Sequence, residues 1–263
     1  MLNDPNSPFQ GVVGLGAVKS EHPRRGSRWT SVIVGVIGIV AAPVLVLVAV
    51  FLGFEAYSQH GLMRADDGAV IPLLVIAVVV FFFGALVLFN ARRTWPLAAV
   101  LYENGLALNR RQGLQVVRWN QVDSVKQAIT RHYYNGVYTG TTHLYTIETQ
   151  DHVKVQLSDQ LSKIEDLGKA VQQGVSGALW PRYLQALEAG QRLTFGPLGL
   201  DKQKLYSGTK ELPWSEIKAI SIKKGIISVK KEKGWFNWAS VTVPQIPNFF
   251  IFLEIAGRFT NLE

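Results

Sequence analysis

The 263-residue chain contains no cysteine and few charged residues, which make up 17% of its length. The absence of cysteine excludes a disulfide framework and any metal site built on thiolates. Soluble domains usually carry about 25% charged residues, and the shortfall here is local. Residues 31–54 and 69–89 contain no Asp, Glu, Lys or Arg at all. The low charge therefore reflects two long apolar segments within an otherwise ordinary chain.

The sequence also lacks the motifs of the common enzyme classes. It has no Walker motif and no nucleophile elbow, and the glycines of residues 11–16 do not follow the order of a dinucleotide-binding loop. The acid pair Glu165-Asp166 is ordinary at a helix start. The five histidines, which include His22 and His60, have no metal-ligand spacing. We expect the other three to lie on strand surfaces: His132, His143 and His152. We therefore predict no catalytic residue, no metal site and no cofactor. The alternative is a membrane enzyme whose active site is not recognisable in one sequence.

Both apolar segments are long enough to cross a bilayer as helices. Residues 31–54 would form a helix about 36 Å long, and a hydrocarbon core of about 30 Å requires only about 20 residues. The core of a signal peptide is shorter, about 7–15 residues. We predict transmembrane helices at 31–54 and 69–90. They follow a flexible basic tail (1–30) and are joined by an external connector (55–68).

The charges that flank these segments indicate an orientation. The chain carries a net charge of +8 with a pI of about 9.7. Five arginines lie at the outer ends of the two segments: Arg24, Arg25, Arg28, Arg92 and Arg93. The connector holds one arginine and three acids: Arg64, Glu55, Asp66 and Asp67. The positive-inside rule then predicts a multi-pass protein of the plasma membrane with both termini in the cytoplasm.

Small residues form a stripe on one face of the first apolar segment: Gly35, Gly38, Ala42, Ala49 and Gly53. The second segment offers Ala77 and Gly84. Small residues allow helices to approach closely, so the stripe serves either the hairpin itself or dimerisation. We favour the hairpin, because two joined helices need an internal contact. Neither segment contains an ionisable residue, which argues against an intramembrane proton relay or ion site.

Beyond Arg93 the pattern changes to short strands with turn signals. Asn104-Gly105 and Asn135-Gly136 predict tight turns. Ser162 and Glu165 form a capping box that opens a helix, which Pro181 should interrupt. A further helix is expected to begin near Asn248.

Two stretches of this region resemble each other. The pattern Trp-x-x-Val/Ile-x-x-Val/Ile begins at Trp119 and again at Trp214, and each is preceded by a Gly-Leu pair, at Gly105 and Gly199. We predict an α+β protein with two β-rich units, residues 98–190 and 193–263, each closed by a helix. The alternative is a coincidence within one larger β-rich domain.

A strand, turn and strand ending at this motif, with further hairpins and a terminal helix, resemble bacterial pleckstrin-homology-like (PH-like) domains. Three features together make most of residues 30–263 similar to an uncharacterised bacterial family of membrane-anchored PH-like proteins. They are the two-helix anchor, the hairpin from Asn135-Gly136 to Thr139-Gly140-Thr141, and the segment Val243–Asn248. The resemblance implies a small barrel or sandwich capped by a helix, with no activity. The eukaryotic phosphoinositide motif is not recognisable, so inositol-lipid binding is not implied.

The segment Lys223–Trp238 combines five lysines with three aromatic residues. It fits a hairpin with solvated lysines and core aromatics, which we favour because charge runs are commonly solvated faces. Alternatively, a membrane-surface contact is formed by Lys230, Lys231, Lys233, Trp235 and Trp238. Nucleic acid is not expected as a partner, because the lysines and arginines do not belong to a recognisable nucleic-acid-binding fold. The leading hypothesis is a non-enzymatic, membrane-tethered PH-like module that binds lipid headgroups or a protein at the cytoplasmic face. Its oligomeric state stays open.

Overall fold

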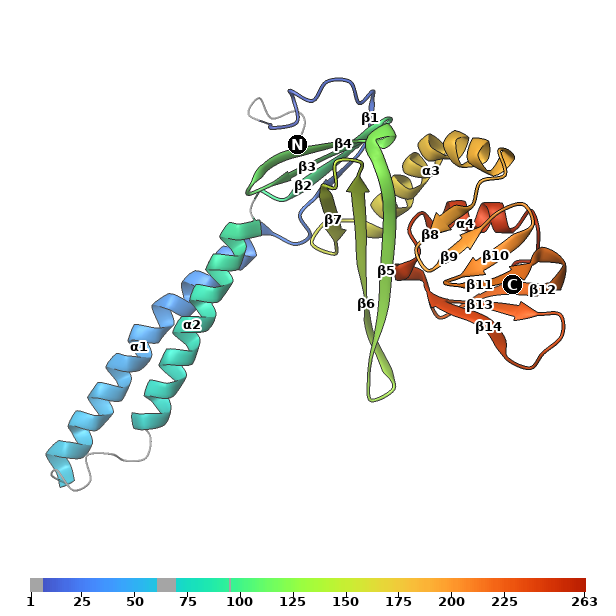
Figure 1. The fold of residues 1–263 in the computed structure, drawn as a ribbon. Coiled ribbons are helices and arrows are strands. Elements are labelled where there is room, and N and C mark those ends of the chain that lie inside the picture. Colours follow the sequence, from blue (N-terminus) through green and yellow to red (C-terminus); the bar gives the residue numbers. More distant parts are fainter. Residues whose placement is uncertain (1–6, 61–69, 95) are drawn as a thin grey trace. The chain divides into compact units, whose positions relative to one another are not determined.

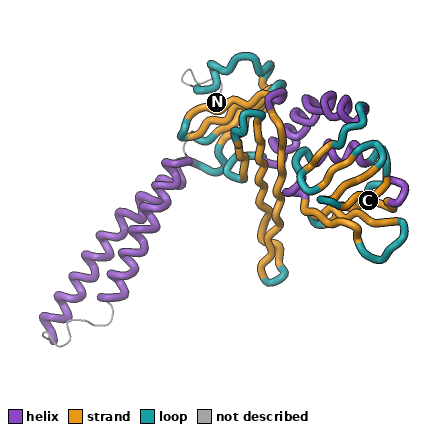
Figure 2. The backbone as a smooth tube through the Cα atoms, in the orientation of Figure 1, coloured by secondary structure: helices purple, strands orange, loops and turns teal. Residues whose placement is uncertain are grey.

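The computed structural model describes residues 7–60, 70–94 and 96–263, and the chain forms two compact units (Figure 1). The helical unit contains Arg24–Leu97 and the turn Arg110–Gly113, and the β-rich unit contains the rest. Figure 2 distinguishes the long helices of the helical unit from the strands and helices of the β-rich unit. The α+β class predicted from the sequence is confirmed at this level.

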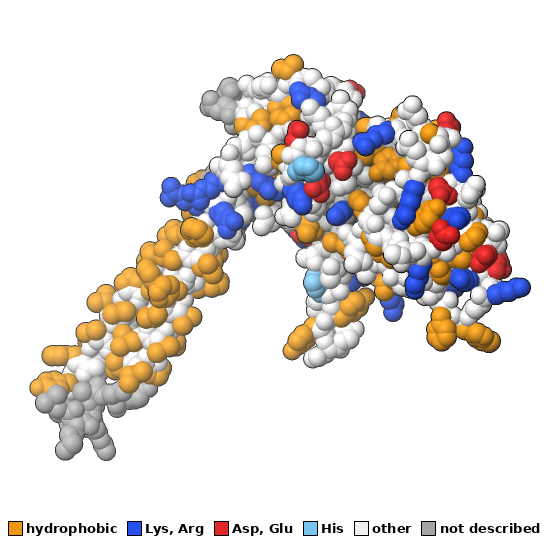
Figure 3. Space-filling model, in the orientation of Figure 1, with side chains coloured by type: hydrophobic (Ala, Val, Ile, Leu, Met, Phe, Trp, Pro, Cys, Tyr) orange, Lys and Arg blue, Asp and Glu red, His pale blue; other side chains and the backbone are white. Residues whose placement is uncertain are grey.

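Two long apolar helices make up the helical unit, α1 (Arg28–His60) and α2 (Val70–Thr94). At 1.5 Å per residue they are about 50 and 38 Å long. Trp29–Ser58 and Val70–Thr94 are long and apolar enough to cross a membrane. Their apolar side chains are largely exposed (Figure 3), unlike those of a core helix in a soluble protein.

Helix α1 extends beyond its predicted limits of 31–54 at both ends, and α2, predicted at 69–90, continues to Thr94, because polar residues at these ends are compatible with helix. Glu55, expected in the connector, belongs to α1. The remaining connector charges, Arg64, Asp66 and Asp67, lie outside the described residues.

Glycine and alanine line the contact between α1 and α2. The buried small residues recur at seven-residue intervals on both helices: Gly35, Ala42, Ala49 and Ala56 on α1, and Ala77, Gly84 and Ala91 on α2. A Cβ added to Gly84 would lie 2.8 Å from the carbonyl oxygen of Gly35, and one added to Gly38 would lie 3.0 Å from the Cα of Gly84. The small-residue stripe of α1 therefore packs within the hairpin, except for the half-buried Gly53.

The first half of the β-rich unit contains a four-stranded sheet, a three-stranded sheet and a helix. The antiparallel four-stranded sheet has the order β1 (Val18–Pro23), β2 (Ala98–Tyr102), β3 (Gly105–Arg110) and β4 (Gly113–Arg118). A 3₁₀ turn, η2 (Trp119–Gln121), leads to β5 (Val122–Tyr134), β6 (Val137–Thr149) and β7 (Lys154–Ser158). Helix α3 (Ile164–Glu188) follows.

The second half has the same sequence of sheets. The four-stranded sheet contains β8 (Leu193–Phe195), β9 (Leu198–Leu200), β10 (Lys204–Ser207) and β11 (Lys210–Pro213). After η3 (Trp214–Glu216) come β12 (Ile217–Lys223), β13 (Ile226–Lys231) and β14 (Asn237–Thr242). The turn η4 (Val243–Gln245) leads to α4 (Phe249–Ala256), which begins where the sequence predicted a helix.

The N-terminal segment differs from the flexible tail that the sequence predicted. Strand β1 pairs with β2 in an antiparallel register, and Phe9 and Leu15 pack in one apolar cluster with Val100 and Tyr102. The strand reads VKSEHP and buries only His22, so no apolar alternation reveals it. The first half of the β-rich unit therefore begins before the helices. In the sequence, the helical hairpin is inserted between β1 and β2. The corresponding strands of the second half, β8 and β9, are joined by a turn alone.

Trp119 and Trp214 occupy equivalent strand ends. Each opens the 3₁₀ turn that joins a four-stranded sheet to a three-stranded one, and each is buried. The Trp119 indole N–H donates to the carbonyl of Glu103 at 3.0 Å, and that of Trp214 donates to the carbonyl of Asp201 at 2.9 Å. Both acceptors lie just after the second strand of their four-stranded sheet.

The alignment of the two Gly-Leu pairs is wrong, although the register after each tryptophan agrees with the structure. Gly105 begins β3, whereas Gly199 lies within β9, one strand earlier in the order. The hairpins before the two tryptophans differ in length, so only the residues that follow them align without a gap.

Helix α3 also differs from its prediction at two points. Its N-cap is Lys163 in the left-handed region (φ 50°), without a side-chain cap, so Ser162 and Glu165 do not form a capping box. The helix continues through Pro181, which is exposed. The carbonyl of Gly177, which a proline at this position leaves without its helical partner, also lies on the exposed face. Water can bind it there, so the proline does not end the helix.

Asn248 connects the two halves of the β-rich unit. Its backbone N–H donates to the Val125 carbonyl at 2.8 Å, and its side-chain oxygen accepts the Val125 N–H at 2.9 Å. Its amide nitrogen donates to the Asp123 carbonyl at 2.9 Å and to the Tyr183 hydroxyl at 3.0 Å. One residue thus satisfies the open edge of β5 and contacts α3.

We expect Asn248→Ala to destabilise the β-rich unit by about 2–4 kcal/mol, because the buried N–H of Val125 and the partly buried carbonyl of Asp123 lose their side-chain partner. Chemical denaturation of the full chain in detergent measures the change. Asn237→Ala is the matched control, since Asn237 is exposed and its side chain makes a 3.4 Å contact with Ser240. Equal stability of the two variants would contradict the assigned role of Asn248.

Candidate functional site

The lysine–aromatic loop, residues 230–236, comprises the end of β13 and the connection to β14, and it is the most exposed aromatic feature of the β-rich unit. Trp235 is fully exposed (100%) and Phe236 is 90% exposed. The favoured interpretation placed the aromatics of this segment in the core, and for these two residues it is wrong. Only Trp238, which lies on β14, is partly covered.

The lysines of the segment divide between the two ends of the β12–β13–β14 sheet. Lys223 and Lys224 lie at the β12–β13 turn, whereas Lys230, Lys231 and Lys233 lie beside the exposed aromatics. Strand β13 separates the two groups by roughly 20 Å at about 3.3 Å per residue. Lys230 makes an exposed ion pair with Glu263 at 3.8 Å, which contributes little in water. The loop therefore joins three lysines to two solvent-exposed rings.

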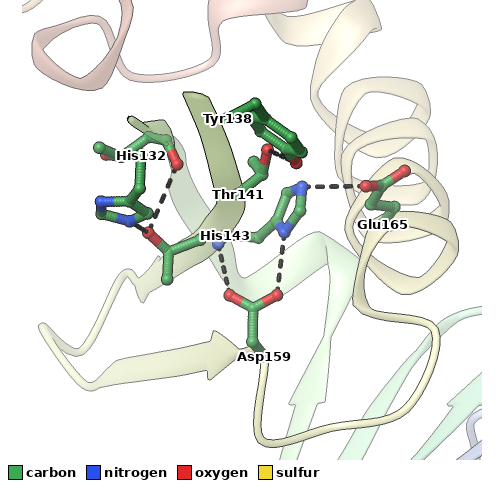
Figure 4. Close-up of polar contacts among 8 residues, drawn as sticks. His132, Tyr138, Thr141, His143, Asp159 and Glu165 are labelled. Carbon is green, nitrogen blue, oxygen red and sulfur yellow. Dashed lines mark hydrogen bonds and ion pairs between the residues drawn. The ribbon is translucent and has the colours of Figure 1, made fainter. Parts of the chain in front are cut away.

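His143 is buried on β6, in contrast to the surface position predicted for it. Only 7% of the residue is exposed, and carboxylates face both ring nitrogens (Figure 4). Nδ1 lies 3.0 Å from Oδ1 of Asp159, and Nε2 lies 3.1 Å from Oε1 of Glu165. Asp159 also accepts the His143 backbone N–H, just beyond the end of β7. This arrangement connects β6, the loop after β7 and the first turn of α3.

The imidazole of His143 is occupied by contacts within its own cluster. Both ring nitrogens face carboxylates, so in this arrangement neither nitrogen is available to a ligand. The cluster borders an open depression, which is lined by Thr130, Thr142, His143 and Asp159 among others. Within residues 7–60, 70–94 and 96–263, no group of His, Asp and Glu side chains could hold a metal ion. The cluster serves to connect neighbouring elements. His132 is exposed on β5, as predicted, whereas the exposed His152 lies in the connection between β6 and β7 and not on a strand.

The carboxyl of Asp201 has the clearest electrostatic perturbation among the described acids. Burial opposes its ionisation, but hydrogen bonds from Tyr206 and from the N–H groups of Gln203 and Lys204 outweigh burial and lower its pKa. A depressed pKa stabilises the fold above the ordinary value of Asp, and this contribution is lost as the pH falls through the folded-state pKa. The residue supports the turn that holds Trp214, so its perturbation is structural.

Fold and surface together define a protein with two apolar helices of membrane-spanning length and a β-rich unit that carries an exposed, basic aromatic loop. The chain belongs to a family of unknown function (DUF6585), whose model matches residues 8–261. The match includes β1, both long helices and α4. No curated protein matches the chain.

Proposed function

We propose that this protein is a membrane-tethered, non-enzymatic binding module whose lysine–aromatic loop contacts anionic lipid headgroups on the cytoplasmic side. The observation that carries the proposal is the complete exposure of Trp235 beside Lys230, Lys231 and Lys233. A large ring costs free energy in water, and tryptophan favours the membrane interface.

The connections between the two units support this proposal. Residues 24–27 join β1 to α1, and residues 95–97 join α2 to β2. Fully extended, such links span no more than about 18 Å. If α1 and α2 cross the bilayer, the β-rich unit stays close to the headgroups. The arginines that flank α1 and α2 favour the cytoplasmic side.

The repeated order of sheets supports a duplicated PH-like architecture. Both halves run through four strands, a 3₁₀ turn that begins with tryptophan, three strands and a helix. The residue six positions after each tryptophan, Val125 or Ile220, bonds at a sheet edge to a later segment, which contains Asn248 or Asn261–Glu263 respectively. A duplicated binding domain fits a scaffold.

The test uses the full chain in nanodiscs, with a single cysteine at Phe236 that carries an environment-sensitive fluorophore. The natural absence of cysteine makes the label unique. In nanodiscs with anionic lipid we expect a blue shift and quenching by spin-labelled lipid, because each lysine near an anionic surface contributes about 1 kcal/mol. Added salt should reduce both signals, since exposed charges are screened beyond about 3 Å at 1 M.

Two triple variants separate local charge from total charge. Lys230→Gln, Lys231→Gln and Lys233→Gln together should lower the quenching severalfold. The control replaces three exposed lysines elsewhere in the same half, Lys210, Lys218 and Lys223, and so removes the same charge. Equal quenching in neutral and anionic nanodiscs, or equal loss in both variants, would count against a headgroup contact by this loop.

A further inference from the structure

The β5–β6 hairpin extends well beyond the sheet to which it belongs. Strand β7 pairs with β6 only from Leu144 to Glu148, whereas β5 and β6 pair as far as Tyr134 and Val137. Residues 129–142 therefore form a two-stranded ribbon, here called the aromatic ribbon (Figure 1). Asn135 (φ 47°) and Gly136 (φ 78°) close it with the tight turn that the sequence predicted.

Large apolar side chains gather at the closed end of the aromatic ribbon and are exposed. The exposed fractions are 60% for Tyr133, 72% for Tyr134, 67% for Val137 and 55% for Tyr138. The rings of Tyr133 and Tyr138 meet edge to face at 5.9 Å, and the Tyr138 hydroxyl bonds to Thr141 at 2.7 Å. The end is thus a preorganised apolar surface.

The charged residues of the hairpin between Asp123 and Glu148, the two acids at its open end, are positive. Residues 124–147 contain Lys126 and Arg131 and no acid. The apolar side chains lie at the tip of the ribbon, whereas a surface that pairs with a protein strand would place them along an edge. An apolar, aromatic tip above basic residues matches the polarity gradient of a bilayer with anionic headgroups.

We propose that the closed end of the aromatic ribbon is a second lipid contact, which inserts Tyr134 and Val137 into the interfacial region of the bilayer. This inference rests on the membrane tethering in the proposed function, but on a different segment of the chain. Because insertion is driven by apolar and aromatic burial, the contact forms on neutral as well as anionic lipid. In this respect it differs from the lysine–aromatic loop.

The experiment places a single labelled cysteine at Val137 in the full chain and reconstitutes it in nanodiscs of neutral phosphatidylcholine. We expect a blue-shifted emission and quenching by spin-labelled lipid at least twice that of a control label at Lys210, which is exposed on the second half. The signal should persist in 0.5 M NaCl. Tyr134→Ser, which leaves the Tyr133–Tyr138 contact in place, should reduce the quenching severalfold, whereas Thr139→Ser should not.

The outcomes are distinct from those of the Phe236 label. A water-accessible label at Val137, quenched by iodide and not by lipid, overturns the ribbon contact whatever Phe236 does. Protection that requires an added soluble protein also overturns it and assigns the ribbon to a protein partner. Protection at Val137 with none at Phe236 supports the ribbon and counts against the lysine–aromatic loop.

Discussion

Trp119→Ala and Trp214→Ala are each expected to destabilise the β-rich unit by about 3–5 kcal/mol, the usual cost of removing a buried aromatic side chain. Trp119 packs against α3, where a Cβ on Gly174 would lie 2.5 Å from the indole nitrogen. Trp214 stacks on Phe259 with ring centroids 4.9 Å apart. Since domains are stable by only about 5–15 kcal/mol, each variant should show early thermal unfolding and rapid proteolysis in detergent.

Two further substitutions show whether position and hydrogen bonding account for this effect. Trp235→Ala removes the same side chain from a fully exposed site and should change stability by less than about 0.5 kcal/mol. Trp119→Phe keeps an aromatic ring but removes the hydrogen bond to the carbonyl of the exposed Glu103, at a cost of about 0.5–1.5 kcal/mol. If Trp235→Ala destabilises as much as Trp119→Ala, the assignment of core and surface tryptophans is wrong.

Gly84→Leu should prevent α1 and α2 from packing at their present separation. A Cβ at Gly84 already lies 2.8 Å from the Gly35 carbonyl oxygen and 2.9 Å from the Ile39 nitrogen. Both are backbone atoms, so a rotamer change cannot relieve the contact. Overpacking usually costs about 1–3 kcal/mol, and a leucine side chain at a helix crossing should reach the upper limit. When the Gly84→Leu variant is heated in detergent, we expect half of the monodisperse protein to be lost at a lower temperature than for the unchanged chain.

Val79→Leu is the matched control for the helical unit. Val79 lies on the same helix, is 60% exposed and accepts a larger apolar side chain without a clash. The thermal stability of Gly84→Ala should lie between those of Gly84→Leu and Val79→Leu. Comparable stability of Gly84→Leu and Val79→Leu would show that the contact between the small residues of α1 and α2 does not hold the hairpin together. The small-residue stripe would then be available for contacts between copies.

The long helices and the Asn135-Gly136 turn follow from local properties of the sequence. An uninterrupted apolar run has few alternatives to a helix of that length, because only a helix satisfies its own backbone. Asn-Gly accepts the left-handed conformations that a tight hairpin requires. The register of aliphatic residues after Trp119 and Trp214 could also be predicted from the sequence, because these residues are close along the chain and are buried together.

The pairing of β1 with β2 and the environment of His143 were decided by the tertiary structure. Strand β1 is polar, and both long helices separate it in the sequence from its partner β2. Local periodicity does not predict such a pairing. Asp159 and Glu165 reach His143 only because β6, the loop after β7 and α3 converge.

The tryptophans show the same division between sequence and tertiary structure. The sequence by itself determined that Trp119 and Trp214 open equivalent motifs, but it did not separate them from Trp235. The tertiary structure decided that difference. Trp119 and Trp214 meet Gly174, Phe259 and turn carbonyls supplied by other strands and helices. No described element covers Trp235. Burial depends on which distant residues arrive at a side chain, and residue type alone does not specify them.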